Sequence, residues 1–338
     1  MQSPAFTLDP LLYDFELPLH AVYHPLGFSV QISTNSHLVL AAAEESWGRF
    51  RKAFPEPPIE VRIGVLKGGS QHRPPAPVCR GHRNLMTQTA DAENFAVSDV
   101  RQGFAFGWLT QAVVKNKAYL RYHFLEGTVW NLLESLYLTA IHGACVKLEQ
   151  HGVLLCGDSG AGKSSLSFAC ARRGWIFLSD DSSCLIRKRE DRVVIGNPFQ
   201  MRFRESAIEL FPELKNQRVT PQLSGDMAIE LATANFPEIA TALECPIDYI
   251  VFLNRRDPKP VGLSRFPKER ALAWLEQSVC YGETGVREAR KAALRNLLTA
   301  EVFELRYADL DSAVRHLEGL VRDDLKPPVG SGTAIGIR

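Results

Sequence analysis

The segment 153–174 constrains the fold of this chain more than any other part of its sequence. Four apolar residues, 153–156, predict a strand that runs into Gly157-Asp158-Ser159-Gly160-Ala161-Gly162-Lys163-Ser164. This run matches the pattern G-x-x-x-x-G-K-[ST] at every position. Residues 165–173 then favour a helix, and Gly174 is well suited to end it. A strand, a glycine-rich turn and a helix in this order predict a phosphate-binding loop in an α/β domain.

The chemistry of that loop follows from its residue types. Glycines let the backbone turn its N–H groups inward, and the start of a helix favours an anion. The predicted nucleotide-binding residues are Gly157, Asp158, Ser159, Gly160, Ala161, Gly162, Lys163, Ser164 and Ser165. Lys163 would reach the β- and γ-phosphates, and the Ser164 hydroxyl would hold Mg²⁺. The sequence therefore predicts binding of a nucleoside triphosphate.

An acidic pair follows the next predicted strand. Residues 176–178 are apolar and lead through Ser179 into Asp180-Asp181, and only 17 residues separate Lys163 from Asp180. The chain thus forms one helix and returns at once to a strand that ends in two carboxylates. Two adjacent carboxylates can divide the work, since one can bind Mg²⁺ while the other accepts a proton from an attacking hydroxyl.

His142 lies 21 residues before Lys163, at the start of a predicted hairpin. Two apolar runs flank Gln150-His151-Gly152, and the second run is the strand that enters the glycine-rich turn. His142 is therefore one strand away from the predicted phosphate site. Both a structural and a catalytic role are open for it.

The rest of the chain is organised around this motif. Short apolar runs at 28–32, 59–66, 103–109 and 111–115, interrupted by a helix-like segment at 41–54, predict a mostly β N-terminal domain over residues 1–122. A phosphate-loop domain over 123–325 opens with an amphipathic helix at 124–139 and contains helices at 267–279, 284–298 and 310–322. Residues 326–338 are predicted to be a disordered tail.

Composition excludes several classes of protein. The net charge of +1, from 39 basic and 38 acidic residues, predicts no nucleic-acid partner, because nothing provides a face that follows phosphates. No apolar stretch is long enough to span a bilayer, and the N-terminus has no signal-peptide pattern. Seven cysteines without a CxxC pair read as reduced thiols, so we expect a cytoplasmic protein.

The pattern IHG…GVLLCGDSGAGKSS…RRGWIFLSDD resembles the catalytic domain of HPr kinase/phosphorylase. That resemblance implies an α/β fold like that of the HPr kinase C-terminal domain, related to phosphoenolpyruvate carboxykinase, after a smaller mostly β N-terminal domain. The chain looks closer still to diverged HPr kinase-like proteins, of which one branch phosphorylates a serine of lasso-type peptides. The "LSDD" strand, the segment 197–204 and the helix-rich C-terminal part are the features that suggest this branch.

The resemblance also implies roles for individual residues. Lys163 and the loop amides would bind ATP, Ser164 and Asp181 would hold Mg²⁺, and Asp180 would accept the proton of the acceptor hydroxyl with His142 nearby. The assignment of base and metal ligand between the two aspartates stays open. Cations near the acceptor are expected for phosphoryl transfer. The candidates are Arg202, Arg204, Arg255 and Arg256.

Two departures from the family pattern bear on the acceptor. Ser165 stands where HPr kinases carry Glu, and the segment E-I-R-G-L-G-I-I, which contacts the protein substrate in that family, is replaced by residues 198–211. We therefore expect the chemistry to transfer but not HPr itself as the substrate. HPr kinases assemble into hexamers, so a homo-oligomer is compatible with the resemblance.

The leading hypothesis is a Mg²⁺-dependent ATP kinase whose acceptor is a hydroxyl on a peptide, a protein or a small molecule. Three alternatives stay open: a small-metabolite kinase, a carboxykinase-like enzyme, and a regulator that senses ATP without transferring it. The retained acidic pair and His142 argue against the sensor, because a protein that only binds ATP needs no base. Reverse, phosphorolytic activity is a further option that the resemblance raises.

Overall fold

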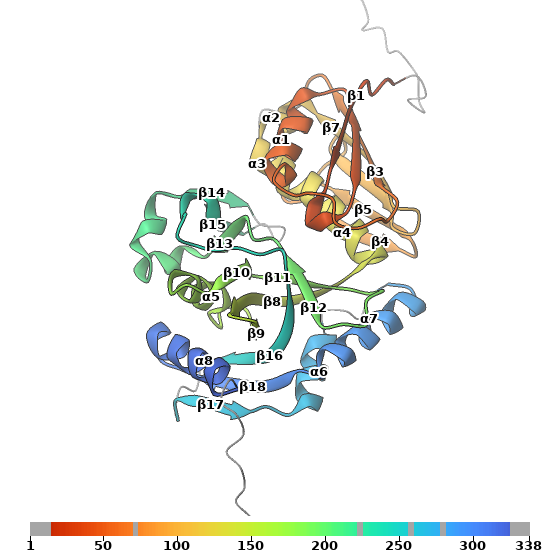
Figure 1. The fold of residues 1–338 in the computed structure, drawn as a ribbon. Helices are drawn as coiled ribbons and strands as arrows, with labels where there is room; N and C mark the ends of the chain where they lie inside the picture. The colour runs from red at the N-terminus through yellow and green to blue at the C-terminus, as the bar shows by residue number, and fades with distance from the viewer. Residues whose placement is uncertain (1–14, 70–73, 222–225, 256–259, 278–281, 325–338) are drawn as a thin grey trace, which may run out of the picture. The chain divides into compact units, whose positions relative to one another are not determined.

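The computed structural model describes residues 15–69, 74–221, 226–255, 260–277 and 282–324 (Figure 1). The chain folds into two compact units. Unit 1 consists of Met1–Leu138, Asn216–Glu230 and Tyr281–Arg287, and unit 2 of Thr139–Lys215, Leu231–Cys280 and Glu288–Arg338. This division differs from the predicted boundary between residues 122 and 123, because residues 123–138 and two later segments pack with unit 1. The predicted tail, 326–338, lies outside the described residues.

Unit 1 contains a mixed seven-stranded sheet in the order β1-β2-β3-β7-β6-β5-β4. Strands β2, β3 and β7 run parallel, and the other neighbours pair antiparallel. The strands are β1 (Leu19–Tyr23), β2 (Val30–Thr34), β3 (Ile59–Leu66), β4 (Val78–His82), β5 (Leu85–Thr89), β6 (Phe95–Asp99) and β7 (Phe104–Thr110). In β3, Ile59, Val61 and Ile63 are buried while Glu60 and Arg62 are exposed, the alternation of a strand with one buried face.

Helices of unit 1 pack against the sheet, and α1 to α3 lie together beside its strands in Figure 1. They are the 3₁₀-helix η1 (Pro25–Gly27), α1 (His37–Trp47), α2 (Gln111–Lys115), α3 (Lys117–Tyr119), the π-helix η2 (Leu120–Glu126) and α4 (Gly127–Leu136). The apolar run 111–115, predicted as one of the β-type runs, is thus a helix. The Thr110 hydroxyl accepts a hydrogen bond from the Val113 N–H and caps its start, at 3.4 Å.

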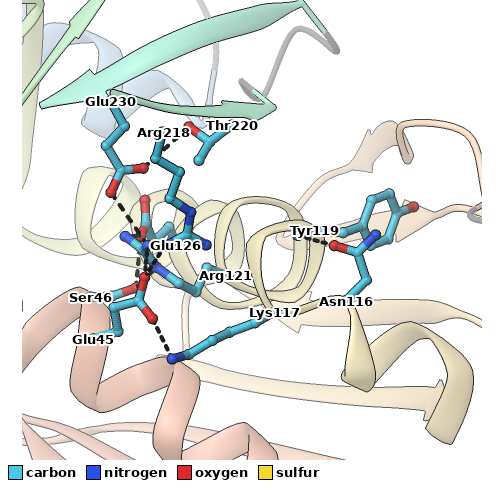
Figure 2. A network of polar contacts seen from close by, with 10 residues as sticks. All are labelled: Glu45, Ser46, Asn116, Lys117, Tyr119, Arg121, Glu126, Arg218, Thr220 and Glu230. Carbon is cyan, nitrogen blue, oxygen red and sulfur yellow. Dashed lines mark hydrogen bonds and ion pairs between the residues drawn. The ribbon is translucent and has the colours of Figure 1, made fainter. Parts of the chain in front are cut away.

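Unit 1 also holds a hairpin from much later in the sequence, β14 (Arg218–Pro221) and the part of β15 (Met227–Ala232) that ends at Glu230. Figure 2 shows the ion pairs around it. The Arg121 side chain is only 2% exposed and contacts Glu45, Glu126 and Glu230, at 2.5, 3.3 and 3.4 Å. Arg218 contacts Glu45 at 2.5 Å. We call Arg121 and its three carboxylates the Arg121 cluster.

Unit 2 is built on an eight-stranded sheet with the order β10-β8-β11-β12-β16-β18-β17, in which β9 pairs with both β16 and β8. Strand β9 is parallel to β16 and antiparallel to β8. The strands are β8 (Leu138–Leu148), β9 (His151–Cys156), β10 (Ile176–Ser179), β11 (Ser182–Ile186), β12 (Val193–Gly196), β16 (Glu244–Asn254), β17 (Gly262–Arg265) and β18 (Glu301–Arg306). The predicted hairpin before the glycine-rich turn is confirmed, with Glu149 and Gln150 between its strands.

Helices cover both faces of this sheet. They are α5 (Lys163–Arg172), α6 (Lys268–Glu276), α7 (Thr284–Leu297) and α8 (Leu310–Asp324), as the helical patterns predict. Alternate residues of β16 belong to two separate apolar cores, with Ile250 packed among residues of α6 and α7 and Val251 among residues of α5 and α8. Such near-continuous apolar strands are typical of a sheet buried on both faces.

Further short elements lie between β12 and β16 in the sequence. They are β13 (Gln200–Phe203) and the 3₁₀-helices η3 (Glu205–Glu209), η4 (Pro212–Asn216) and η5 (Thr233–Asn235). Strand β13 lies in the segment 198–211, which contains the candidate arginines Arg202 and Arg204. Among the described residues, no helix is long and apolar enough to cross a membrane.

Candidate active site

Residues 157–162, here called the glycine loop, connect β9 to α5. Gly157, Gly160 and Gly162 have φ angles of 147°, 85° and 97°, which lie in the region that side chains disfavour. A Cβ on Gly162 would also lie 2.5 Å from the Tyr307 hydroxyl. The backbone of Gly162 caps α5, whose first helical residue is Lys163. The predicted strand–loop–helix is therefore present, and its loop leads into a helix N-terminus.

Lys163 folds back over the glycine loop, with only 6% of the residue exposed. Its Nζ donates to the Gly157 carbonyl at 2.8 Å and to the Asp158 carbonyl at 3.4 Å. Desolvation by burial lowers the pKa of Lys163, and the charge of Asp181 opposes that shift. The ammonium group is therefore held at the loop, and loop carbonyls occupy the hydrogen bonds that an anion would otherwise accept.

His142, on β8, connects Lys163 with Asp181. Its Nε2 lies 3.0 Å from Lys163 Nζ, and its Nδ1 lies 3.0 Å from Asp181 Oδ1. An ammonium group only donates, so Nε2 accepts, and Nδ1 then carries the proton that is donated to Asp181. The three side chains form a hydrogen-bonded chain. The structure therefore brings His142 to Asp181.

Asp180 and Asp181 differ strongly in their titration. Desolvation by burial, followed by the charge of Asp181, raises the pKa of Asp180 to about 7, although the Arg202 backbone N–H, 2.5 Å from Asp180 Oδ2, favours the carboxylate. Burial also acts to raise the pKa of Asp181, but the hydrogen bond from His142 and the charges of Lys163 and Arg202 outweigh it and lower the pKa. One carboxyl can accept a proton near neutral pH while its neighbour stays ionised.

Oxygen donors suitable for Mg²⁺ gather at the same strand end. Ser164 is the second residue of α5, and its hydroxyl lies 3.5 Å from the Asp180 carbonyl oxygen, at the limit of a hydrogen bond. Hydroxyl and carboxylate oxygens are the protein ligands that Mg²⁺ prefers when phosphates supply the rest. Ser164, Asp180 and Asp181 therefore fit a magnesium ion in the chemistry of their donors. Ser165, the remaining predicted binding residue, follows in the first turn of α5.

Two of the predicted arginines lie at the glycine loop. Arg204, just after β13, donates from Nη2 to the Ser159 hydroxyl at 2.6 Å. Arg255, just after β16, places Cδ 3.3 Å from where a Gly162 Cβ would be. Arg202 contributes its backbone N–H and its charge to the aspartate pair. Arg256 lies outside the described residues.

Two aromatic residues at the glycine loop were not predicted. The Trp274 indole N–H donates to Asp158 Oδ1 at 3.3 Å, and the Tyr307 hydroxyl donates to the Ala161 carbonyl at 2.9 Å. They lie 116 and 146 residues from their partners in the sequence. Trp274 follows the apolar period of its helix and Tyr307 comes directly after a strand, so no local signal marks either as a site residue.

The fold and these contacts define a class: a mixed α/β protein with a glycine-rich loop at a helix N-terminus, beside two neighbouring aspartates whose pKa values are shifted in opposite directions. Residues 136–209 match the model of the family described as HPr Serine kinase C-terminal domain. This segment includes His142, the glycine loop, both aspartates, Arg202 of β13 and Arg204 just after it. The predicted resemblance to the HPr kinase-like family is confirmed, and the match covers this segment of the chain.

Individual relatives agree with the family model. The HPr kinase/phosphorylase of Halalkalibacterium halodurans is 40% identical over 76 residues, which are 22% of this chain and 24% of that protein. The HPr kinase/phosphorylase of Shouchella clausii matches to the same extent, and that of an Exiguobacterium species is 36% identical over 75 residues, also 22% and 24% of the two chains. The chain thus spans about a quarter of the length of these relatives.

Among solved structures, the HPr(Ser) kinase/phosphatase from Coxiella burnetii is similar. The alignment covers 55% of this chain and 93% of that chain, with 11% sequence identity and a TM-score of 0.33.

Proposed function

We propose that this chain is an ATP-dependent phosphotransferase that moves the γ-phosphate of ATP to a hydroxyl group. The observation that carries the proposal is the arrangement of Lys163, His142, Asp181 and Asp180 at the end of the glycine loop. The relatives at residues 136–209 are named as kinases, which supports the same reaction class. We further propose that the domain is a phosphate-loop fold of the phosphoenolpyruvate carboxykinase type.

Binding of the nucleotide is assigned to the glycine loop and Lys163. The loop residues 157–162 and the first turn of α5 offer backbone N–H groups at a helix N-terminus, where the helix dipole favours phosphate. Lys163 would exchange the Gly157 and Asp158 carbonyls for phosphate oxygens. Arg204 and Arg255 would add positive charge at the loop.

Proton transfer is assigned to Asp180. Its raised pKa, about 7, makes its carboxylate basic enough to take the proton of an acceptor hydroxyl at neutral pH. Asp181, kept ionised by His142, would hold Mg²⁺ together with Ser164. Bound Mg²⁺ would neutralise phosphate charge, as in other phosphoryl-transfer enzymes.

The acceptor is proposed to be a hydroxyl on a peptide, a protein or a small molecule. The segment 198–211 is proposed to take part in its selection, because this segment follows the aspartate pair and carries Arg202 and Arg204. A role in selecting the acceptor is also proposed for the N-terminal part of the chain, which lies outside the residues that match the family model.

Substitution of Asp180 separates a kinase from a sensor that binds ATP without transferring it. Asp180→Asn keeps an oxygen that can accept from the Arg202 N–H but removes the base. We expect ATP affinity within about tenfold of the wild-type value, because the base acts after binding, and a turnover reduced by about 10²- to 10⁴-fold. Equilibrium binding of Mg·ATP and a turnover assay measure the two effects. Unchanged turnover would refute the role of Asp180, and loss of all binding would make it a metal or phosphate ligand.

A further inference from the structure

The glycine loop is held from two sides by aromatic hydrogen-bond donors. On one side, Trp274 of α6 donates its indole N–H to the Asp158 carboxylate. On the other side, Tyr307, just after β18, donates its hydroxyl to the Ala161 carbonyl. Asp158 and Ala161 are themselves joined, because the Ala161 N–H donates to the Asp158 carbonyl at 3.0 Å. The two donors thus act on the two ends of one tight turn.

Both aromatic side chains are fixed by the cores from which they come. The Trp274 ring packs edge-on against Phe252, with centroids 5.3 Å apart, and Phe252 stacks on Phe266 at 4.6 Å. Tyr307 is 1% exposed and belongs to the apolar core between the sheet and α5 and α8. Trp274 packs against the core on the opposite face, beside α6 and α7. The loop is therefore tied to both cores of unit 2.

A loop with three glycines needs such support. Glycine loses more backbone freedom on ordering than any other residue, so an unsupported glycine loop would order only when an anion binds. Affinity for the anion would then be reduced by the entropy of ordering the loop. Hydrogen bonds that already fix the turn remove part of this loss before binding.

We propose that Trp274 and Tyr307 are positioning residues that preorganise the glycine loop for a polyphosphate chain. The inference rests on the proposed nucleotide site. It extends that site to two residues outside the segment 136–209 that the family model matches. Because the two donors hydrogen-bond to the loop, we expect them to set affinity for the phosphate chain irrespective of the nucleobase attached to it.

Binding of ATP and of inorganic tripolyphosphate to the full chain, with Mg²⁺ at fixed pH, tests the inference. Trp274→Phe and Tyr307→Phe each remove one hydrogen-bond donor and keep an aromatic ring. We expect each variant to bind both ligands about 3- to 10-fold more weakly than the wild-type protein, by the same factor for the two ligands. The matched control is Trp175→Phe, since the Trp175 indole N–H is buried and has no hydrogen-bond partner among the described residues. We expect its affinities to stay within about twofold of wild type.

A double-substitution cycle keeps the test independent of general destabilisation. In an Asp158→Ala background the indole N–H has lost its acceptor, so adding Trp274→Phe should weaken tripolyphosphate binding no further. A residue that only stabilises the fold would weaken binding again in that background.

Three outcomes contradict the inference in different ways. If the wild-type protein binds ATP and both aromatic variants bind it equally well, the preorganisation is refuted and the proposed function stands. If the variants lose affinity for ATP but not for tripolyphosphate, the aromatic residues act on the nucleoside and not on the loop. If the wild-type protein binds neither ligand, the proposed function fails and the inference fails with it.

Discussion

Asp180 and Asp181 are neighbours in the chain, but their environments move their pKa values in opposite directions. Asp180 is desolvated, faces the charge of Asp181 and receives one backbone N–H, so its pKa rises to about 7. Asp181 accepts a hydrogen bond from His142 Nδ1 and is affected by the charge of Lys163, so its pKa falls. Two adjacent carboxyls with separated pKa values are suited to different roles in one reaction. We assign the base to Asp180 and the metal to Asp181 on this ground.

The pKa of Asp180 predicts how activity depends on pH. A general base works only when deprotonated, so kcat/KM for phosphoryl transfer should rise about tenfold per pH unit below pH 7 and level off above it. A pH–rate profile between pH 5.5 and 8.5 measures this dependence. A profile that is flat from pH 5.5 to 7 would contradict the assignment of Asp180 as the base.

Lys163 supplies the charge at the glycine loop. Lys163→Ala removes the ammonium group and should weaken ATP binding by about 10- to 100-fold, the loss expected for a charge-assisted hydrogen bond, and abolish nucleotide-dependent turnover. The fold should persist, because the apolar cores do not include this side chain. Titration with Mg·ATP measures the binding, a turnover assay the activity, and circular dichroism the fold. Unchanged ATP turnover in this variant would refute the site.

Elements that depend on local rules were predictable from the sequence. The strand, the glycine loop and the helix over residues 153–172 follow from an apolar run, glycines and a helix start that are adjacent in the chain. The run 111–115 was not predictable as a helix, because five residues show no clear period and the Thr110 cap decides the outcome. The hairpin β14–β15 belongs to unit 1 through ion pairs that join residues up to 173 positions apart, which no local pattern reveals.

The Arg121 cluster attaches that hairpin within unit 1 (Figure 2). Arg121 is buried between three carboxylates, and burial raises the pKa of Glu230. Arg121→Met keeps the aliphatic stem but leaves the carboxylates without their central cation. Removing one partner of a buried ion pair costs about 3–5 kcal/mol, so we expect a loss of this size in the free energy of unfolding at pH 8. Urea denaturation measures it.

Two comparisons make the Arg121 experiment specific. Arg62→Met breaks the exposed pair with Glu60 in the same unit and should cost less than about 1 kcal/mol. The loss in the free energy of unfolding caused by Arg121→Met should shrink as pH falls toward 4.5, because Glu230, whose pKa is raised by burial, then binds a proton in the folded variant. Equal stabilities of Arg121→Met and Arg62→Met at pH 8 would show that the cluster does not anchor the hairpin.

At the scale of the whole molecule, the sequence predicted which residues gather at the glycine loop better than it predicted the distant residues that hold the loop in place. The segment 136–209 contains the motif residues, and the structure places His142, Lys163, Asp181 and Arg204 around the glycine loop. Trp274 and Tyr307 reach the same loop from far along the chain, and residues 123–138 fold with unit 1. Both facts depend on tertiary packing, which local propensity and spacing do not determine.

Transfer of the γ-phosphate tests the central claim most directly. The full chain is incubated with Mg²⁺ and γ-labelled ATP in host extract separated into small molecules and macromolecules, with Asp180→Asn as the blank. Label that appears in either fraction with the wild-type protein and not with Asp180→Asn is the predicted result, and the labelled fraction identifies the class of acceptor. No label in either fraction, from a protein that still binds ATP, would contradict the proposed kinase activity and indicate a nucleotide sensor.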